Sequence, residues 1–278
     1  GGWGRVNFGN EDGAAYLLQV AAPSADSNVD GLRTTIQGYS FDFGTLDYDH
    51  AQFGNTPSTT PVNAIVLGIP TLDTSVDRFT YMTPKFNGFQ GGFSYAPRAE
   101  LANGVLNTVS LGTYENLWEL AARWDGNFEG VGLSFGAGYS TSDDATGVPL
   151  GDAEAWNVGF NLAWNQFSFG GSWLDEENDP LTALIVGGPV DTTTWVLGAA
   201  WDNGPYHVGV SYLDRTDEIT ATPDIDSYKA TVGAGYTFGP GMTFRGAVAF
   251  GEASNATLLG AGQEGEFTQV TLGTDIQF

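Results

Sequence analysis

The stretch AEAWNVGFNLAWN, residues 153 to 165, alternates large apolar side chains with small or polar ones. The large apolar set is Trp156, Val158, Phe160, Leu162 and Trp164. In a β-strand, successive side chains point to opposite faces, so a pattern with a period of two sorts residues by face. The stretch therefore predicts a strand with one wholly apolar face and one face of asparagine, glycine and alanine.

The same alternation recurs along the chain and predicts twelve strands, most of them ~9 to 12 residues long, the length that a tilted strand needs to cross a bilayer. The predicted strands are 3–9, 78–83, 88–96, 116–126, 130–141, 153–165, 167–176, 193–203, 206–217, 226–238, 241–252 and 264–278.

The apolar face decides between a soluble and a membrane protein. A soluble sandwich or barrel turns bulky residues inward and charges outward. Here the apolar face carries no Lys, Arg, Asp or Glu at its central positions. Soluble proteins do not leave so large an apolar area uncovered, and no amphipathic helical stretch is long enough to cover it. We therefore expect an all-β protein, a transmembrane antiparallel up-and-down β-barrel whose apolar face contacts lipid.

The tryptophans of this face lie mostly near strand ends, which predicts two membrane-interface levels rather than a buried tryptophan core. Trp156 and Trp164 lie about 26 Å apart along a strand, or roughly 20 Å in height at a ~40° tilt, close to the separation of two aromatic girdles. The predicted interface aromatics are Trp118, Trp124, Trp156, Trp164, Trp173, Trp195, Trp201 and the terminal Phe278.

Composition excludes several classes of protein. The 278 residues include 33 acidic and 9 basic ones, a formal charge of −24 that would repel nucleic acid. Cysteine is absent, which excludes disulfides and thiolate metal sites. His50 and His207 are the only histidines, and no Gly-x-Ser-x-Gly, P-loop or His-Glu-x-x-His motif occurs. We expect no enzymatic activity.

The links between the predicted strands alternate between short and long, as in an up-and-down barrel with turns on one side and loops on the other. The short links contain Gly, Asn or Pro and are 84–88, 126–130, 165–167, 203–206 and 238–241. The longest link, 10–77, is too long for a simple connection and should have a function. Residues 11–20 within it are predicted to form a short helix.

Two segments and the terminus carry a family resemblance. GGWGRVNFGNEDGAA, residues 1–15, contains a G-R-V-x-x-G pattern, and DRFTYMTPKFNGFQGGFSYAP, residues 77–97, contains R-x-x-Y-x-[ST]-P-x-F-x-G-F. Together with the long link between them, they resemble the general porins of Gram-negative bacteria, most closely the alphaproteobacterial type. The ending FTQVTLGTDIQF resembles the assembly signal of outer-membrane proteins.

The resemblance implies a single barrel over 1–278 in the bacterial outer membrane, in a family with sixteen strands that forms homotrimers. Segment 3–9 corresponds to the family's fifth strand, so we expect four further strands before Gly1. The alternative is a closed twelve-stranded barrel in which 3–9 pairs with 264–278.

Alternation places most basic residues on the inner face, where they are predicted to line a lumen. These wall residues are Arg5, Arg78, Arg123, Arg245 and Lys229, with Glu119 among them. The resemblance implies that 10–77 folds into the barrel as a constriction. Its carboxylates are Glu11, Asp12, Asp26, Asp30, Asp42, Asp47, Asp49, Asp73 and Asp77. Opposed to the wall arginines, they would set a transverse field. Simple hydration of the lumen explains any single arginine equally well.

We therefore expect a water-filled channel for passive diffusion of small hydrophilic solutes and ions, with a weak cation preference from its net acidity. The alternative is a structural or adhesive barrel with a plugged lumen. The glycine-rich inner faces of 130–141 and 226–238 leave space and favour a conduit.

No cofactor is expected. Asp47, Asp49 and His50 are a weak Ca²⁺ candidate, for which a solvated loop is the preferred interpretation. The acidic runs Asp143-Asp144 and 175–179 are predicted on outer loops, where a divalent cation could bridge them to lipopolysaccharide, although such runs are usually hydrated. The expected partners are outer-membrane lipid, lipopolysaccharide, small solutes and two further copies of the chain.

Overall fold

The computed structural model describes the twelve predicted strands and parts of the long link between the first two. The described residues are 2–10, 13–23, 25, 39–41, 44–46, 77–98, 114–144, 153–177, 191–218, 224–239, 241–254 and 264–276.

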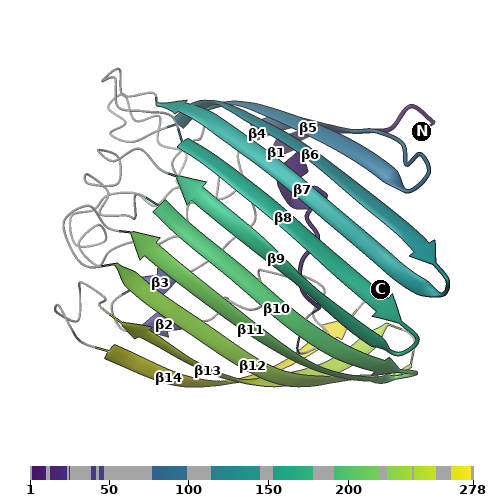
Figure 1. The fold of residues 1–278 in the computed structure, drawn as a ribbon, viewed down its shortest axis with the longest axis vertical. Coiled ribbons are helices and arrows are strands. Elements are labelled where there is room, and N and C mark those ends of the chain that lie inside the picture. Colours follow the sequence, from purple (N-terminus) through teal and green to yellow (C-terminus); the bar gives the residue numbers. More distant parts are fainter. Residues whose placement is uncertain are drawn as a thin grey trace.

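One antiparallel sheet contains twelve strands, each hydrogen-bonded to its neighbour in chain order (Figure 1). The strands are β1 (Arg5–Asn10), β4 (Asp77–Met82), β5 (Phe89–Arg98), β6 (Tyr114–Phe128), β7 (Val131–Asp144), β8 (Ala153–Trp164), β9 (Phe167–Glu177), β10 (Asp191–Asn203), β11 (Tyr206–Glu218), β12 (Ile225–Thr237), β13 (Met242–Ser254) and β14 (Glu264–Ile276). The predicted all-β, up-and-down antiparallel architecture is confirmed. Several strands, such as β6, extend beyond their predicted ends, because backbone pairing does not require the side-chain alternation to continue.

The short links form tight turns that suit the twist of the strands. Asn87 and Gly88, between β4 and β5, have φ values of 49° and 86°. Glu129 and Gly130, between β6 and β7, have φ values of 50° and 85°. Two successive residues with positive φ characterise the type I′ turn, whose backbone twist matches the right-handed twist of paired strands. These turns set the antiparallel register of the strands that they join. They lie at one end of the strands, called here the turn side, and the opposite end of the strands is called the loop side.

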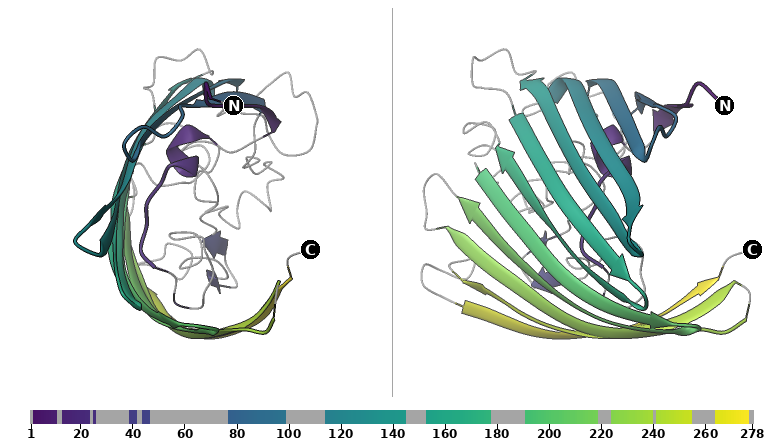
Figure 2. Two further views of the ribbon diagram at one scale, coloured as in Figure 1. Left: turned by 90° about the vertical axis from the view of Figure 1, so that its right-hand side faces the viewer. Right: turned by 45° about the vertical axis from the view of Figure 1, so that its right-hand side comes forward.

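The sheet curls into a trough, with β1 at one margin and β14 at the other (Figure 2). Among the described residues β1 pairs with β4 and β14 pairs with β13, and β1 and β14 are not paired with each other. The alternative pairing of 3–9 with 264–278 is therefore not formed. The expectation of a sixteen-stranded barrel stays a prediction.

Residues 13–23 lie on the concave side of the trough (Figure 2). They begin with α1 (Ala14–Leu17), a single helical turn and thus shorter than the predicted span of 11–20. Leu17 N donates to Gly13 O at 2.9 Å, and beyond Leu18 the chain continues along the sheet. A two-stranded hairpin that the sequence analysis did not predict, β2 (Tyr39–Phe41) with β3 (Gly44–Leu46), is drawn on the same side.

The two faces of the sheet invert the usual pattern of a soluble protein. On β8, the inner Ala155 and Asn157 are 0% and 1% exposed, whereas the outer Trp156 and Val158 are 50% and 47% exposed. Large apolar side chains are thus displayed on the convex surface, and polar ones are buried on the concave side. An apolar surface of this extent requires an apolar medium around it.

Candidate functional site

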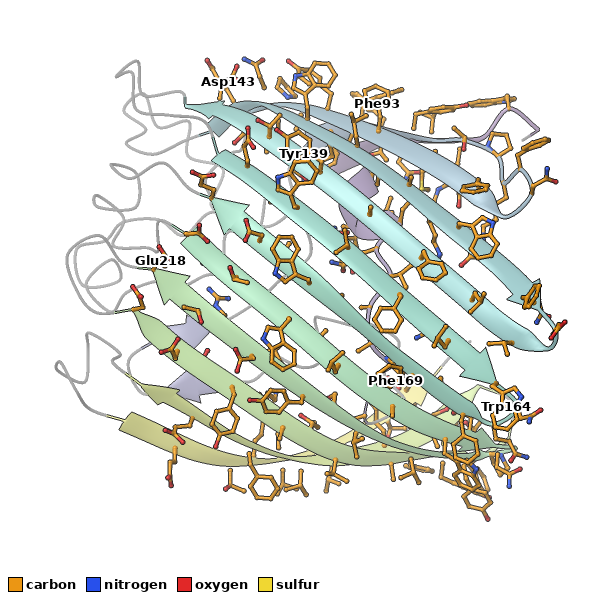
Figure 3. All side chains as sticks on the ribbon, in the orientation of Figure 1. Phe93, Tyr139, Asp143, Trp164, Phe169 and Glu218 are labelled. Atoms are coloured by element: carbon orange, nitrogen blue, oxygen red, sulfur yellow. The ribbon has the colours of Figure 1, made fainter. Side chains whose placement is uncertain are left out.

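The convex surface carries aromatic side chains at two levels. At the loop side the tryptophans are Trp118, Trp156, Trp173 and Trp195, and at the turn side they are Trp124, Trp164 and Trp201. Ring contacts accompany both levels, such as Tyr139 with Trp156 at 4.5 Å between centroids and Tyr206 with Tyr236 at 5.2 Å. Figure 3 shows Tyr139, Phe169 and Trp164 on this surface. The predicted Phe278 lies outside the described residues.

Between these levels the outward positions of the described strands carry no Asp, Glu, Lys or Arg. Leu120, Val210, Val232 and Phe250 are examples, each 47% to 60% exposed. Two aromatic levels with an uncharged apolar band between them are the pattern of a strand surface in a bilayer.

Beyond the loop-side aromatics the outer surface becomes acidic. Asp191, the first residue of β10, lies opposite Glu177 of β9 and opposite Glu218 of β11. Asp143 and Glu218 lie at this edge in Figure 3. Like charges on adjacent strands repel each other, so this band favours contact with water or cations. Across the described residues, no group of three or more His, Asp or Glu side chains is arranged to hold a metal ion.

On the concave side a buried ion pair holds the start of α1. Arg78 of β4 and Glu119 of β6 meet at 2.7 Å, with side chains 2% and 1% exposed. Glu119 Oε2 also accepts a hydrogen bond from Ala15 N at 3.0 Å, and Ser94 Oγ accepts one from Ala14 N at 2.8 Å. The first free N–H groups of a helix need such acceptors, and a carboxylate makes the stronger bond.

Two asparagines of β8 hold the chain after α1. Asn157 Nδ2 donates to Ala15 O at 3.4 Å, and Asn161 Nδ2 donates to Ala21 O at 3.4 Å. Both asparagines belong to the small or polar set that the sequence alternation assigned to the inner face. The backbone of residues 13–23 is therefore bound to the wall through side chains of β5, β6 and β8.

Other predicted wall residues lie on the concave side away from α1. Arg123 Nε donates to Asp125 Oδ1 at 2.8 Å, and Lys85 reaches Asp125 Oδ2 at 2.8 Å near the turn side. Arg245 lies 3.4 Å from Asp275 of β14.

The two remaining predicted cations differ in burial. Arg5 of β1 donates to Asn7 at 2.8 Å and is exposed. Lys229 of β12 is 5% exposed.

The structure thus brings Arg78 and Glu119 together as one buried pair. Both lie beneath α1, on the inner face that parity assigned to them. Of the predicted loop carboxylates, Glu11, Asp12, Asp26, Asp30, Asp42, Asp47, Asp49 and Asp73 lie outside the described residues, and for Asp77 only the backbone is described. Their roles, and that of the Asp47–Asp49 metal candidate, stay predictions.

Sequence analysis missed Arg215 of β11, which is 1% exposed on the concave side. It lies opposite Ser227 of β12, and Ser227 is two positions before Lys229 on the same face of that strand. The signal was present in its parity with the buried Ser211 and Leu213. Ser94 was also missed, because its importance comes from α1 rather than from its own strand.

Comparison with known proteins identifies the family. A family model described as Gram-negative porin matches residues 1–256. The chain therefore belongs to the Gram-negative porin family, and its place is the bacterial outer membrane. No curated protein sequence matches the chain. Within the described part of the chain, no helix is long and apolar enough to cross a membrane.

Solved structures show the same fold at low identity. An anion-selective porin from Comamonas acidovorans matches with a TM-score of 0.52 at 18% identity, over 73% of this chain and 60% of that one. OmpT of Vibrio cholerae matches with 0.53 at 13%, over 99% and 77%. OprD from Pseudomonas aeruginosa matches with 0.50 at 14%, over 72% and 59%. The chain spans less than two thirds of the Comamonas porin.

Proposed function

We propose that this protein forms a water-filled channel through which small hydrophilic solutes and ions diffuse passively and are not chemically changed. The observation that carries the proposal is the inversion of the two faces. An apolar convex surface faces lipid, and a concave surface of mostly small and polar residues, with an apolar patch of Leu174, Val196 and Leu213 against Ala22, encloses residues 13–23. A barrel interior that is polar and not filled by bulky side chains conducts water and small solutes.

Residues 10–77 act in this proposal as the constriction. Their first described part, 13–23, is bound to the inner wall, so the chain that continues from it starts inside the trough. The carboxylates between Glu11 and Asp77 would then face the wall cations Arg123, Lys229 and Arg245 and set a transverse field. Such a field favours polar solutes, which align their dipoles in it, over apolar ones.

A weak cation preference follows from how the charges are paired. The formal charge is −24. Three of the described wall cations already have carboxylate partners, namely Arg78 with Glu119, Arg123 with Asp125 and Arg245 with Asp275. Each pair has no net charge, so the acidic excess should dominate the net charge of the lumen and favour cations over anions. The named selectivity of the Comamonas porin is a property of that protein, and 18% identity does not transfer it.

We also propose an oligomeric state, by analogy with a solved structure, and a partner at the cell surface, from the charge of the outer surface. A trimer form is described for OmpT of Vibrio cholerae, which matches at 12% identity over 98% of this chain and 75% of that one. We propose a homotrimer here.

The acidic band around Asp191 lies just beyond the loop-side aromatics, where divalent cations could bridge it to lipopolysaccharide phosphates. The channel itself needs no resident cofactor.

Planar bilayer recordings test the function. Purified protein should give discrete conductance steps, and the reversal potential in a potassium chloride gradient should indicate a mild preference for K⁺. An anion preference would refute the selectivity proposal alone. A protein that inserts and gives no conductance would support the structural or adhesive alternative.

A further inference from the structure

Residues 13–23 cross the inner wall over several glycines. Four glycines on β5, β7, β8 and β10 lie directly beneath this segment. These wall glycines are Gly92, which faces Ala14 and Leu18; Gly136, which faces Leu18 and Val20; Gly159, which faces Val20; and Gly198, which faces Ala22 and Pro23.

At three of the wall glycines, the nearest atoms include backbone of the segment. A Cβ at Gly198 would lie 2.6 Å from Pro23 O, and one at Gly136 would lie 3.0 Å from Leu18 O and from Val20 N. At Gly159 a Cβ would collide with Val20 O. Close approach of two backbones is a position that only glycine permits.

A neighbouring glycine shows that this closeness is local. Gly132 lies on β7 four residues before Gly136 and on the same inner face. A Cβ there would meet only Ala163, at 3.5 Å, which is an ordinary van der Waals contact. A Cβ at Gly136 would therefore crowd the segment, whereas a Cβ at Gly132 would not.

Over Gly136 and Gly159 the segment cannot easily tilt to escape a new side chain, because hydrogen bonds hold it on either side of Leu18 and Val20. Glu119 and Ser94 bind the start of α1, and Asn161 binds Ala21. A methyl group added beneath Val20 must therefore lift the middle of the segment away from the wall. Packed interiors respond to one added methyl group with backbone shifts.

We propose that the wall glycines set the distance between residues 13–23 and the wall, and through it the aperture and size limit of the channel. This inference rests on the proposed channel function. Gly159 is the most sensitive position, because a Cβ there would collide with Val20 O, the closest backbone approach among the four wall glycines. Gly92 is the least sensitive, because a Cβ there meets only side-chain atoms, Leu18 Cδ1 at 3.0 Å and Ala14 Cβ at 3.1 Å.

The test compares Gly159→Ala, Gly198→Ala, Gly136→Ala and Gly92→Ala with the matched control Gly132→Ala. Each protein is reconstituted into liposomes, and swelling rates are measured with neutral sugars of increasing size. A segment that is lifted away from the wall moves into the lumen and narrows the channel. A narrower channel lowers the swelling rate for large sugars more than for small ones. A loss of folded protein lowers all rates by one factor, so the ratio of large-sugar to small-sugar rates isolates the aperture.

We expect this ratio to fall most in Gly159→Ala, less in Gly198→Ala and Gly136→Ala, and least in Gly92→Ala, with Gly132→Ala unchanged. If Gly159→Ala does not fold, Gly198→Ala and Gly136→Ala carry the same test. Ratios equal to the control in all folded variants overturn the inference and leave the channel function intact. A wild-type protein that admits no sugar and conducts no current overturns both.

Discussion

Two regions of the molecule are shielded from bulk water: the inner wall beneath residues 13–23 and the outer surface between the two aromatic levels. They differ in whether they contain charged side chains. The inner wall buries Glu119 and Arg78 almost completely. The outer surface, at the same height on the same strands, carries no charge among its described positions.

The difference lies in the partners that each environment supplies. Beneath the segment, Glu119 finds the Arg78 guanidinium and the backbone N–H of Ala15. Hydrocarbon supplies neither a counter-charge nor a hydrogen bond, so a charge there keeps its full desolvation cost. Burial by itself therefore does not predict polarity in this protein, whereas the chemistry of the covering layer does.

Removing one partner of the buried pair should have the largest effect. Glu119→Leu leaves the Arg78 guanidinium buried without its balancing carboxylate, which typically costs about 3–5 kcal/mol. We expect the free energy of unfolding, measured by urea titration in lipid vesicles, to fall by about this amount. The double variant Arg78→Met with Glu119→Leu should recover most of it. A single variant as stable as the wild type would mean that water reaches the pair.

A charge placed on the outer surface should rank second. Val248, at the middle of β13, faces outward opposite Val232 and Val270. Val248→Arg should lower the free energy of unfolding by about 2–4 kcal/mol, as for arginine at the bilayer midplane. Its neighbour Ala247 faces inward, so Ala247→Arg is the matched control and should cost much less. Equal losses in the two variants would contradict the assignment of faces.

Loss of the neutral hydrogen bonds at the start of the segment should have a smaller effect. Ser94→Ala removes the acceptor of Ala14 N and the hydroxyl partner of Thr80 Oγ1, and should cost about 1–2 kcal/mol. Ser140 is a matched control, since it is fully buried on the inner face of β7 and its hydroxyl has no hydrogen-bond partner among the described residues. Ser140→Ala should be neutral in the same urea titration. Similar losses at both positions would indicate packing rather than anchoring.

The exposed ion pair of Lys85 with Asp125 should matter least. Its side chains are 58% and 27% exposed, and solvent-exposed pairs contribute about 0–1 kcal/mol. Lys85→Ala should therefore change the free energy of unfolding within that range, and added salt should abolish the difference. A loss as large as that of Glu119→Leu would show that exposure does not separate the two pairs.

Most of the fold could be predicted from sequence because a strand has a period of two. Each side chain is assigned to a face by counting, as with Trp156 and Asn157 on β8. The turns could also be predicted, because Asn87-Gly88 is a residue pair that tolerates positive φ. The helix in 11–20 was predicted too long, because its apolar residues pack against the wall instead of extending a helical face.

The site was only partly predictable. Parity placed Arg78 and Glu119 on the inner face, but it could not show that they meet, since they are 41 residues apart in sequence. Arg215 could have been found by the same counting, from its parity with Leu213. The need for glycine at Gly159 could not have been found, because Gly132 and Gly159 look alike in an alternating strand.

By itself the sequence determined which face of every strand meets lipid, since that follows from local chain geometry and the cost of placing charge in hydrocarbon. Only the tertiary structure decided which inner residues contact the segment and which remain available to the lumen. That choice depends on the path of residues 13–23 across the neighbouring strands of the wall. Contacts between segments so distant in sequence produce no periodic pattern in either segment.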